Sequence, residues 1–149
     1  MNDTFYLGEG RLNIDLVEQI AKRQLKVGLS EDRSNLLAAR RKLVEGYLHP
    51  DAEPAYGINT GFGALAETRV SSDDLGQLQT NLIRSHCTGV GAPFSEAITR
   101  AIMLLRAQVI SLPTSGARPQ VAHLLVDMIN KGIHPIIPSK GSVGASGDL

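Results

Sequence analysis

The segment GSVGASGDL, close to the end of the sequence, holds a serine between two very small residues, Ala145 and Gly147. Gly141, Gly144 and Gly147 permit backbone conformations that other residues are denied. If the segment bends sharply, the Gly147 amide nitrogen can attack the Ala145 carbonyl carbon. Loss of two waters, one of which takes the Ser146 hydroxyl, then leaves a methylidene-imidazolone ring. Such a ring is an electrophile, which ordinary side chains do not provide. A plain flexible loop is the alternative.

Two other glycine-rich sites do not fit this segment. A phosphate-binding P-loop requires Lys and then Ser or Thr after its last glycine, whereas Gly147 is followed by Asp148, whose charge repels phosphate. A nucleophile elbow requires glycine two residues before and two residues after its serine. Ser146 has Gly144 before it but Asp148 after it. Phosphate binding and serine hydrolysis are therefore disfavoured.

Two further segments carry side chains that can transfer protons or bind a ring. Tyr56 lies in AYGINTGFG, where it either acts as a general acid or base or packs at the edge of a loop. A free phenol has a pKa of about 10, so a tyrosine base at neutral pH needs positive charge or hydrogen bonds at its phenolate. His86, in QTNLIRSHCTGVG, follows Leu82 by four residues and Leu78 by eight, which places it on an apolar helix face. A buried structural histidine is the alternative there.

These three motifs, in this order, resemble the histidine, phenylalanine and tyrosine ammonia-lyase family, and most closely its histidine-specific members. The resemblance extends from Leu12 to the end of the sequence. It implies that Ala145, Ser146 and Gly147 form 4-methylideneimidazol-5-one autocatalytically, and that this group captures the amino group of the substrate. It also implies that Tyr56 acts as general base or acid near the β-carbon of the substrate.

The resemblance further implies two substrate-binding residues and a reaction. His86 faces the substrate ring and favours a polar ring, while Gly63 lets the segment 49–72 approach the ligand and close as a lid. The expected reaction is elimination of ammonia from L-histidine to give urocanate. A tyrosine ammonia-lyase, an aminomutase and a catalytically incompetent helical fragment are the alternatives. The expected partners are L-histidine or a related aromatic amino acid and further copies of the same chain, in a homotetramer.

One stretch departs from the family pattern. Family members commonly have an RANxLA-type segment followed by a glycine before SGxR, whereas this sequence reads RAQVISLPTSGAR. Gln108 is expected to rearrange a buried polar contact, and Pro113 is expected to end the preceding helix differently. The packing near the site is therefore expected to differ in detail from the family pattern, and the three motifs are unaffected.

Hydrophobic periodicity predicts a mainly α protein. Helices are expected over residues 12–24 and 30–48, both on the surface, and over 75–87, where Ser71 or Ser72 would cap the start and Gly89 and Gly91 would end the helix. Segment 49–72 between them is expected to be a loop.

Two more helices are expected in the second half of the sequence. Ser95 would cap the first, which carries an apolar stripe of Ile98, Ala101, Ile102, Leu105 and Val109 and ends at Leu112-Pro113. The second begins at Pro119 and ends at Gly132, with Val121, Leu124, Leu125, Met128 and Ile129 on one face. Strands should be short and peripheral, as around Tyr6-Leu7.

The resemblance implies a place for these helices in a larger fold. Residues 1–149 would be the helical N-terminal portion of an ammonia-lyase/fumarase-like helical-bundle enzyme, with the prosthetic-group loop at 141–149. The downstream helical bundle is absent from this sequence. On this interpretation, the 149-residue chain alone is inactive.

Composition restricts the remaining possibilities. The 15 basic and 15 acidic residues balance, so neither nucleic acid nor an anionic membrane is an expected partner. The single cysteine, Cys87, cannot form an internal disulfide, and neither a signal peptide nor a membrane-spanning run is found, which favours a cytoplasmic protein. His49, His123 and His134 lack the spacing of metal ligands, so no metal is expected.

Overall fold

The computed structural model describes residues 4–141, which form two compact units. The first unit comprises the described parts of Met1–Arg41 and Pro93–Ile137, and the second comprises those of Lys42–Ala92 and Pro138–Leu149. Each unit therefore combines two stretches that are distant in sequence. The described chain is mainly helical with few short strands, as the sequence predicts.

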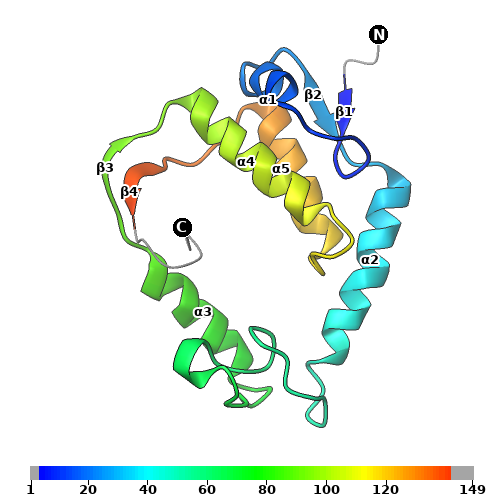
Figure 1. Cartoon of the computed structure of the whole chain (residues 1–149), viewed down its shortest axis with the longest axis vertical. Coiled ribbons are helices and arrows are strands. Elements are labelled where there is room, and N and C mark those ends of the chain that lie inside the picture. Colours follow the sequence, from blue (N-terminus) through cyan, green and yellow to red (C-terminus); the bar gives the residue numbers. More distant parts are fainter. Residues whose placement is uncertain (1–3, 142–149) are drawn as a thin grey trace. The chain divides into compact units, whose positions relative to one another are not determined.

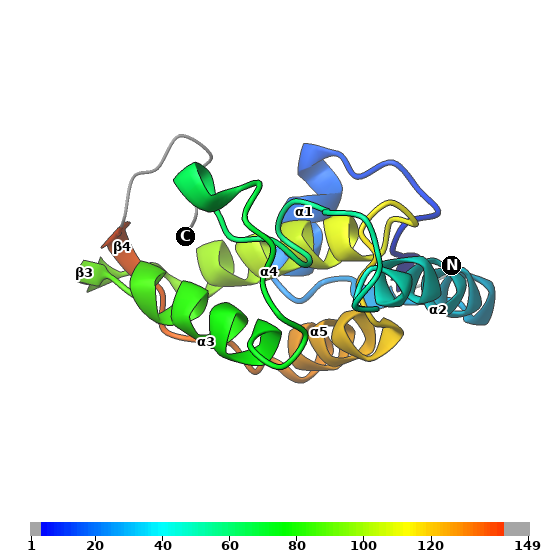
Figure 2. The ribbon, with the colours of Figure 1, turned by 90° about the horizontal axis from the view of Figure 1, so that it is seen from below.

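In the first unit a small parallel strand pair lies beside a group of packed helices (Figure 1). The strands β1 (Thr4–Tyr6) and β2 (Lys26–Gly28) are parallel, and α1 (Ile14–Ala21) forms the crossover that parallel neighbours require. The helix α2 (Glu31–Gly46) begins in this unit and ends in the second. Figure 2 shows α4 (Glu96–Ile110) beside α5 (Pro119–Lys131), and α4 also contacts α1.

The second unit has less regular structure. It contains a 3-10 helix, η1 (Gly63–Leu65), the helix α3 (Leu75–His86) and a two-stranded sheet of β3 (Gly89–Pro93) and β4 (Pro138–Gly141). Residues 49–72 hold no α-helix and no strand, as expected for a loop. The strand near Tyr6 was predicted, whereas β2 and β3 were not.

Several predicted helix boundaries are confirmed. Ser95 caps α4, since its hydroxyl oxygen accepts from the Ile98 amide at 3.4 Å. Pro119 occupies the first turn of α5, and Gly132 ends that helix in the left-handed conformation at φ 71°. The helix α4 ends at Ile110, just before the predicted Leu112-Pro113 stop.

The predicted start and end of α3 need correction. Asp74, not Ser71 or Ser72, occupies the N-cap position. Ser71 instead stabilises the preceding turn, where its hydroxyl accepts from the Asp74 amide at 3.3 Å and donates to the Asp74 carboxylate at 2.7 Å. At the other end, α3 stops at His86 and is capped by Cys87. Gly89 and Gly91 lie in β3, so they extend a strand and do not terminate the helix.

The apolar stripe predicted on α4 does not face the core of its unit. Ile98, Ile102, Leu105 and Val109 are all exposed, and the opposite face, with Met103, Leu104 and Ala107, is buried. Both sets of residues have helical spacing, and α1 and α5 pack against the second set. The face predicted for α5 is partly correct, because Ile129 is buried while Val121 and Leu124 are exposed.

A buried arginine joins three helices of the first unit. The Arg100 side chain extends from α4, and the residue is 2% exposed. Its guanidinium donates to the Ala21 carbonyl at 3.0 Å, to the Ile20 carbonyl at 3.0 Å and to the Ile129 carbonyl at 2.7 Å. These carbonyls lie in the last turns of α1 and α5, where the i+4 donors of a regular helix are lacking. The Ile20 and Ile129 carbonyls also accept from the Arg23 amide at 3.1 Å and the Gly132 amide at 3.3 Å. Burial lowers the pKa of Arg100 from its ordinary value, and Arg23 adds to this effect, but an arginine stays charged.

Two amide side chains connect distant parts of the same unit. Asn130, at the end of α5, accepts from the Val27 amide at 3.0 Å and donates to the Val27 carbonyl at 2.8 Å, so it pairs with β2 as a neighbouring strand would. Gln108 accepts from the Gly8 amide at 3.0 Å. The residue at which the sequence departs from the family pattern therefore anchors the turn after β1.

Replacing Arg100 with methionine should destabilise the protein strongly. The substitution keeps an unbranched side chain but leaves three buried carbonyls without their charged donor, which should lower the free energy of unfolding by about 3 kcal/mol or more. Urea denaturation followed by circular dichroism measures this change. Arg106→Met, on the exposed face of the same helix, is the matched control and should change it by less than about 0.5 kcal/mol. Equal losses in the two variants would contradict the capping role.

Candidate active site

Three predicted site residues, Tyr56, Gly63 and His86, belong to the second unit. Tyr56 and Gly63 lie in the 49–72 segment, and His86 is the last residue of α3. The predicted prosthetic-group residues, Ala145, Ser146 and Gly147, lie outside the described residues. The described chain ends in β4, whose last residue is Gly141.

The 49–72 segment is folded around its own buried polar residues. Asn59, Thr60 and Gly61, in the middle of the motif, are buried. An isolated antiparallel bridge joins Thr60 to Arg69. On either side of it, the Gly61 amide donates to the Thr68 carbonyl at 2.9 Å, and the Val70 amide donates to the Asn59 carbonyl at 3.0 Å. The segment is therefore an ordered loop with internal pairing.

Asn59 connects three parts of this loop through its side-chain amide. Its oxygen accepts from the Ala55 amide at 2.7 Å, and its nitrogen donates to the Tyr47 carbonyl at 2.9 Å and to the Glu53 carbonyl at 3.0 Å. The residue is 2% exposed. Because a buried amide must satisfy its polar atoms within the protein, these contacts fix the local path of the chain.

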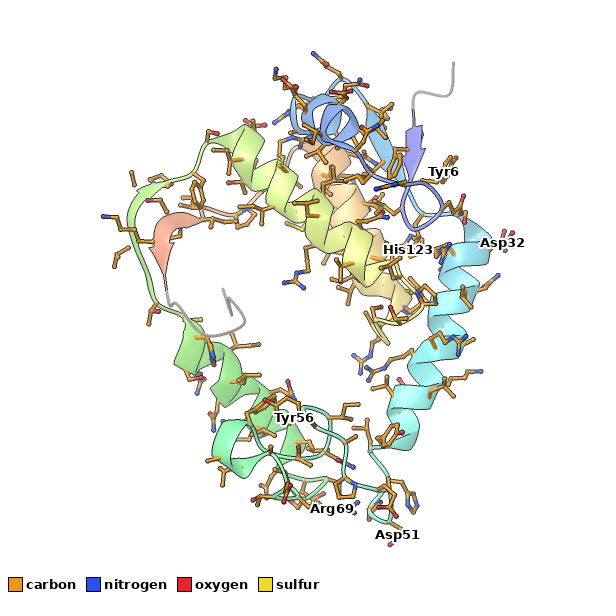
Figure 3. The ribbon with its side chains drawn as sticks, viewed as in Figure 1. Tyr6, Asp32, Asp51, Tyr56, Arg69 and His123 are labelled. Carbon is orange, nitrogen blue, oxygen red and sulfur yellow. The ribbon has the colours of Figure 1, made fainter. Side chains whose placement is uncertain are left out.

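Arg69 holds the outer part of the same loop. Its guanidinium donates to the Ala52 carbonyl at 2.6 Å and to the His49 carbonyl at 3.1 Å. Figure 3 shows Arg69 and Tyr56 on different sides of the segment. On one side of the loop, carbonyl groups accept hydrogen bonds from Arg69. The other side carries the ring of Tyr56, the predicted catalytic residue.

The Tyr56 ring lies on the surface of its unit. The residue is 65% exposed, and its ring meets Phe62 edge to face, with centroids 5.9 Å apart and planes at 75°. Gly57 follows with φ 74°, a conformation that favours glycine. The ring therefore packs on Phe62 by one edge and leaves most of its surface, in this part of the chain, open to solvent.

The motif glycines Gly61 and Gly63 have different structural roles. Gly63 has φ 57°, and a Cβ there would meet nothing within 4 Å, so its backbone conformation is what favours glycine. At Gly61 a Cβ would lie 2.6 Å from the Leu65 Cβ and 2.8 Å from the Leu65 carbonyl oxygen. Gly61 is therefore required by close packing inside the loop, whereas the space beside Gly63 is open.

His86 is half-buried and held by its own helix. Its Nδ1 lies 2.9 Å from the Leu82 carbonyl oxygen and 2.9 Å from the Ser85 hydroxyl. Because a carbonyl oxygen can only accept, the contact with Leu82 places the proton on Nδ1. In the neutral ring Nε2 is then the accepting nitrogen. The ring orientation is thus set by the last turn of α3.

A cavity of about 180 Å³ lies beside the loop, on the side of Arg69. Tyr47, His49, Arg69, Ser72 and Leu75 are among its lining residues, and none of the predicted site residues lines it. It is smaller than ordinary ligand pockets, which measure about 300 Å³ or more. The candidate site is therefore assigned to the chemistry of Tyr56 and His86 and not to this cavity.

Within residues 4–141, no three His, Cys, Asp or Glu side chains gather in a way that could hold a metal ion. The helices of that same range include none with the length and apolar content needed to cross a membrane. The expectation that no metal is required stays a prediction.

Comparison with known proteins identifies the family. The sequence model of the aromatic amino acid lyase family matches residues 12–149. The chain belongs to this family. It is 47% identical over 133 residues to a histidine ammonia-lyase of Natranaerobius thermophilus, covering 89% of this chain and 26% of that protein. It is 48% identical over 140 residues to the Sorangium cellulosum enzyme of the same name, covering 93% and 27%.

Solved structures of other lyase-family proteins share the fold. Tyrosine aminomutase from Streptomyces globisporus matches with a TM-score of 0.85 and 31% identity, over 93% of this chain and 26% of that one. Histidine ammonia-lyase from Trypanosoma cruzi matches with a TM-score of 0.80 and 29% identity, over 95% and 27%. The chain thus spans about a quarter of the length of its aromatic amino acid lyase relatives.

The sequence did not predict the residues that stabilise the 49–72 segment. Asn59 stands inside the recognised motif, so its position was visible, but nothing in its surroundings distinguished a buried amide from a ligand contact. Arg69 lies six residues after Gly63 in a stretch without periodicity. Its contacts with the His49 and Ala52 carbonyls depend on how the loop returns on itself.

Replacing Gly61 with alanine should loosen the loop. The new Cβ would overlap Leu65 backbone and side-chain atoms, which should cost about 1 to 3 kcal/mol of stability. Limited proteolysis within residues 49–72 should become faster, as followed by mass spectrometry. Gly76→Ala, in α3 of the same unit, is the control, because a Cβ there meets nothing within 4 Å. If cleavage rates in both variants matched the unmodified protein, the packing role of Gly61 would be wrong.

Proposed function

We propose that the whole protein carrying this chain eliminates ammonia from L-histidine to give urocanate. The carrying observation is the likeness, at 46 to 48% identity, to several curated histidine ammonia-lyases over about nine-tenths of the chain. The segment Ala145-Ser146-Gly147 lies within the stretch that the family model matches. Substrate, activity and partners of the whole protein are inferred from this likeness.

The prosthetic group follows from the residues of that segment. The Ala145 carbonyl, the Ser146 hydroxyl and the unhindered Gly147 amide nitrogen are the three groups that formation of 4-methylideneimidazol-5-one uses. When formed, the ring supplies an electron sink for departure of the substrate's amino group. We therefore include it in the proposal, with no requirement for a metal.

Tyr56 and His86 take the proton-transfer and ring-binding roles in this proposal. The exposed Tyr56 phenol would move the proton at the β-carbon of the substrate. His86, with Nδ1 held by Leu82, would orient a polar substrate ring through its other nitrogen. Gly63, with open space beside its backbone, would let the 49–72 segment close over the substrate as a lid.

A homotetramer and a cytoplasmic location complete the proposal. Exposed aliphatic residues on one face of α4, namely Ile98, Ile102, Leu105 and Val109, are typical of a surface that another part of an assembly covers. The described Cys87 is exposed and unpaired, which suits a reducing compartment.

Tyrosine chemistry is the second candidate. The fold likeness to tyrosine aminomutase, at 31% identity, is as strong as that to the histidine enzyme of known structure. A phenol and an imidazole are both polar rings, so His86 accommodates either. Product analysis separates the two: urocanate from L-histidine supports the first candidate, and 4-hydroxycinnamate or a β-amino acid from L-tyrosine supports the second, as a tyrosine ammonia-lyase or an aminomutase.

The prosthetic group is tested by Ser146→Ala in the whole protein. The wild-type protein should have an intact mass lower than that of its translated sequence by two water molecules. The variant should keep the full translated mass and lose at least about 100-fold in kcat because no ring forms. Ser139→Ala, in β4, is the control and should retain both the mass difference and the turnover. If the wild-type protein had its full translated mass, the result would favour a helical domain without activity.

The ring-binding role is tested by His86→Leu. Removing the imidazole should lower kcat/KM for L-histidine by about 10- to 100-fold, and it should lower kcat/KM for L-phenylalanine less or raise it, because an apolar pocket favours an apolar ring. His123→Leu is the control, since His123 contacts Ser34 in the first unit at 3.1 Å. An unaltered ratio of the two specificity constants in His86→Leu would remove this residue from the substrate site.

A further inference from the structure

The backbone just before Tyr56 is fixed on both of its polar groups. The Ala55 amide donates to the Asn59 side-chain oxygen at 2.7 Å. The Ala55 carbonyl accepts from the Ile58 amide at 3.0 Å and from the Asn59 amide at 3.2 Å. Residues 55–59 therefore form a closed turn, and Asn59 binds the start of that turn through both its backbone and its side chain.

Asn59 also ties this turn to the chain before and after it. Its side-chain nitrogen donates to the Tyr47 carbonyl, just after α2, and to the Glu53 carbonyl, and its own carbonyl accepts from the Val70 amide. Arg69 meanwhile binds the His49 and Ala52 carbonyls. The two side chains divide the loop: Arg69 holds its outer part, and Asn59 holds the turn that carries Tyr56.

We propose that Asn59 is the positioning residue for Tyr56, setting where the phenol lies when substrate binds. This inference rests on the catalytic role of Tyr56 proposed above. The Tyr56 ring itself is largely exposed and meets Phe62 by its edge, so side-chain packing restrains it weakly. Its location is thus governed by the backbone at Ala55, which the buried Asn59 amide holds.

The expected effect is on turnover more than on binding. Asn59 is buried and bonds to backbone atoms, so its loss would not remove a substrate contact. A catalytic group displaced by about 1 Å can cost about 100-fold in rate. Asn59→Ala should therefore lower kcat by about 10- to 100-fold and change KM by less than about threefold.

The experiment is a double-mutant cycle in the whole enzyme, combining Asn59→Ala with Tyr56→Phe. If Asn59 acts through Tyr56, the two losses in kcat will not multiply, and Asn59→Ala will cost little in the Tyr56→Phe background. Asn130→Ala is the matched control. It removes another asparagine that bridges backbone groups, at Val27 in the first unit, and should leave kcat within about twofold.

The outcomes separate this inference from the proposed function. An undiminished kcat in Tyr56→Phe overturns the catalytic role of Tyr56 and with it the positioning role. A large loss in Tyr56→Phe, with losses that multiply fully in the double variant, overturns the positioning role alone. A loss in Asn130→Ala equal to that in Asn59→Ala also overturns it, since general destabilisation then explains both.

A measurement on the unmodified protein keeps the test decisive if Asn59→Ala does not fold. Amide hydrogen exchange, read by NMR or fragmentation mass spectrometry, should be at least about 100-fold slower at Ala55 than at the exposed Ala64 of η1. Protection of this size supports the restraint at Ala55. Equal exchange rates at the two alanines would overturn it.

Discussion

The first unit depends on one charged side chain, Arg100, at buried helix ends whose polar carbonyl groups apolar packing cannot satisfy. Two helices, α1 and α5, end against α4, and the carbonyls of their last turns lack the i+4 amide donors of a regular helix, although the Arg23 and Gly132 amides each donate to one of them. Water would normally satisfy these groups, but here they are buried. The Arg100 guanidinium supplies donors in a rigid fork and adds a positive charge where both helix dipoles are negative. The buried residues of the core, among them Leu7, Ile20 and Leu104, can then close around these helix ends.

The second unit uses the same physical solution, with the neutral Asn59 amide as well as the charged Arg69 guanidinium. Among its described residues, the fully buried positions are Asn59, Thr60 and Gly61, whereas the buried apolar side chains lie in the first unit. Order in the 49–72 segment therefore comes from hydrogen bonds to backbone groups, with Asn59 and Arg69 as the principal donors. Segments held in this way open at lower free energy than an apolar core does. That property suits a segment proposed to admit and cover a substrate.

The helices were predictable from sequence because their signals are local. Ser95, Pro119 and Gly132 act at the helix ends where they stand. The choice of the buried face on α4 was not predictable, since two apolar sets share helical spacing and tertiary contacts decide between them. Arg100 precedes Met103, Leu104 and Ala107 by three, four and seven residues, which puts all four on one face of the helix. Because an arginine is usually exposed, this spacing does not by itself predict a buried face. The strands β2 and β3 lack alternation of polar and apolar residues, and they form by pairing with β1 and β4.

The motif from Tyr56 to Gly63 combines two kinds of residue that its letters do not distinguish. Asn59, Thr60 and Gly61 point into the loop and would be required for folding whatever the reaction. Tyr56 and Gly63 lie on the outside, where the Tyr56 side chain can be replaced without disturbing that internal structure, whereas the positive φ of Gly63 still favours glycine. The middle residues of the motif therefore stabilise the loop. Among the exposed side chains of the motif, the Tyr56 phenol is the one able to transfer a proton. The structure therefore shows the Tyr56 phenol on the surface of its unit, and the catalytic role of Tyr56 stays a proposal that the Tyr56→Phe variant tests.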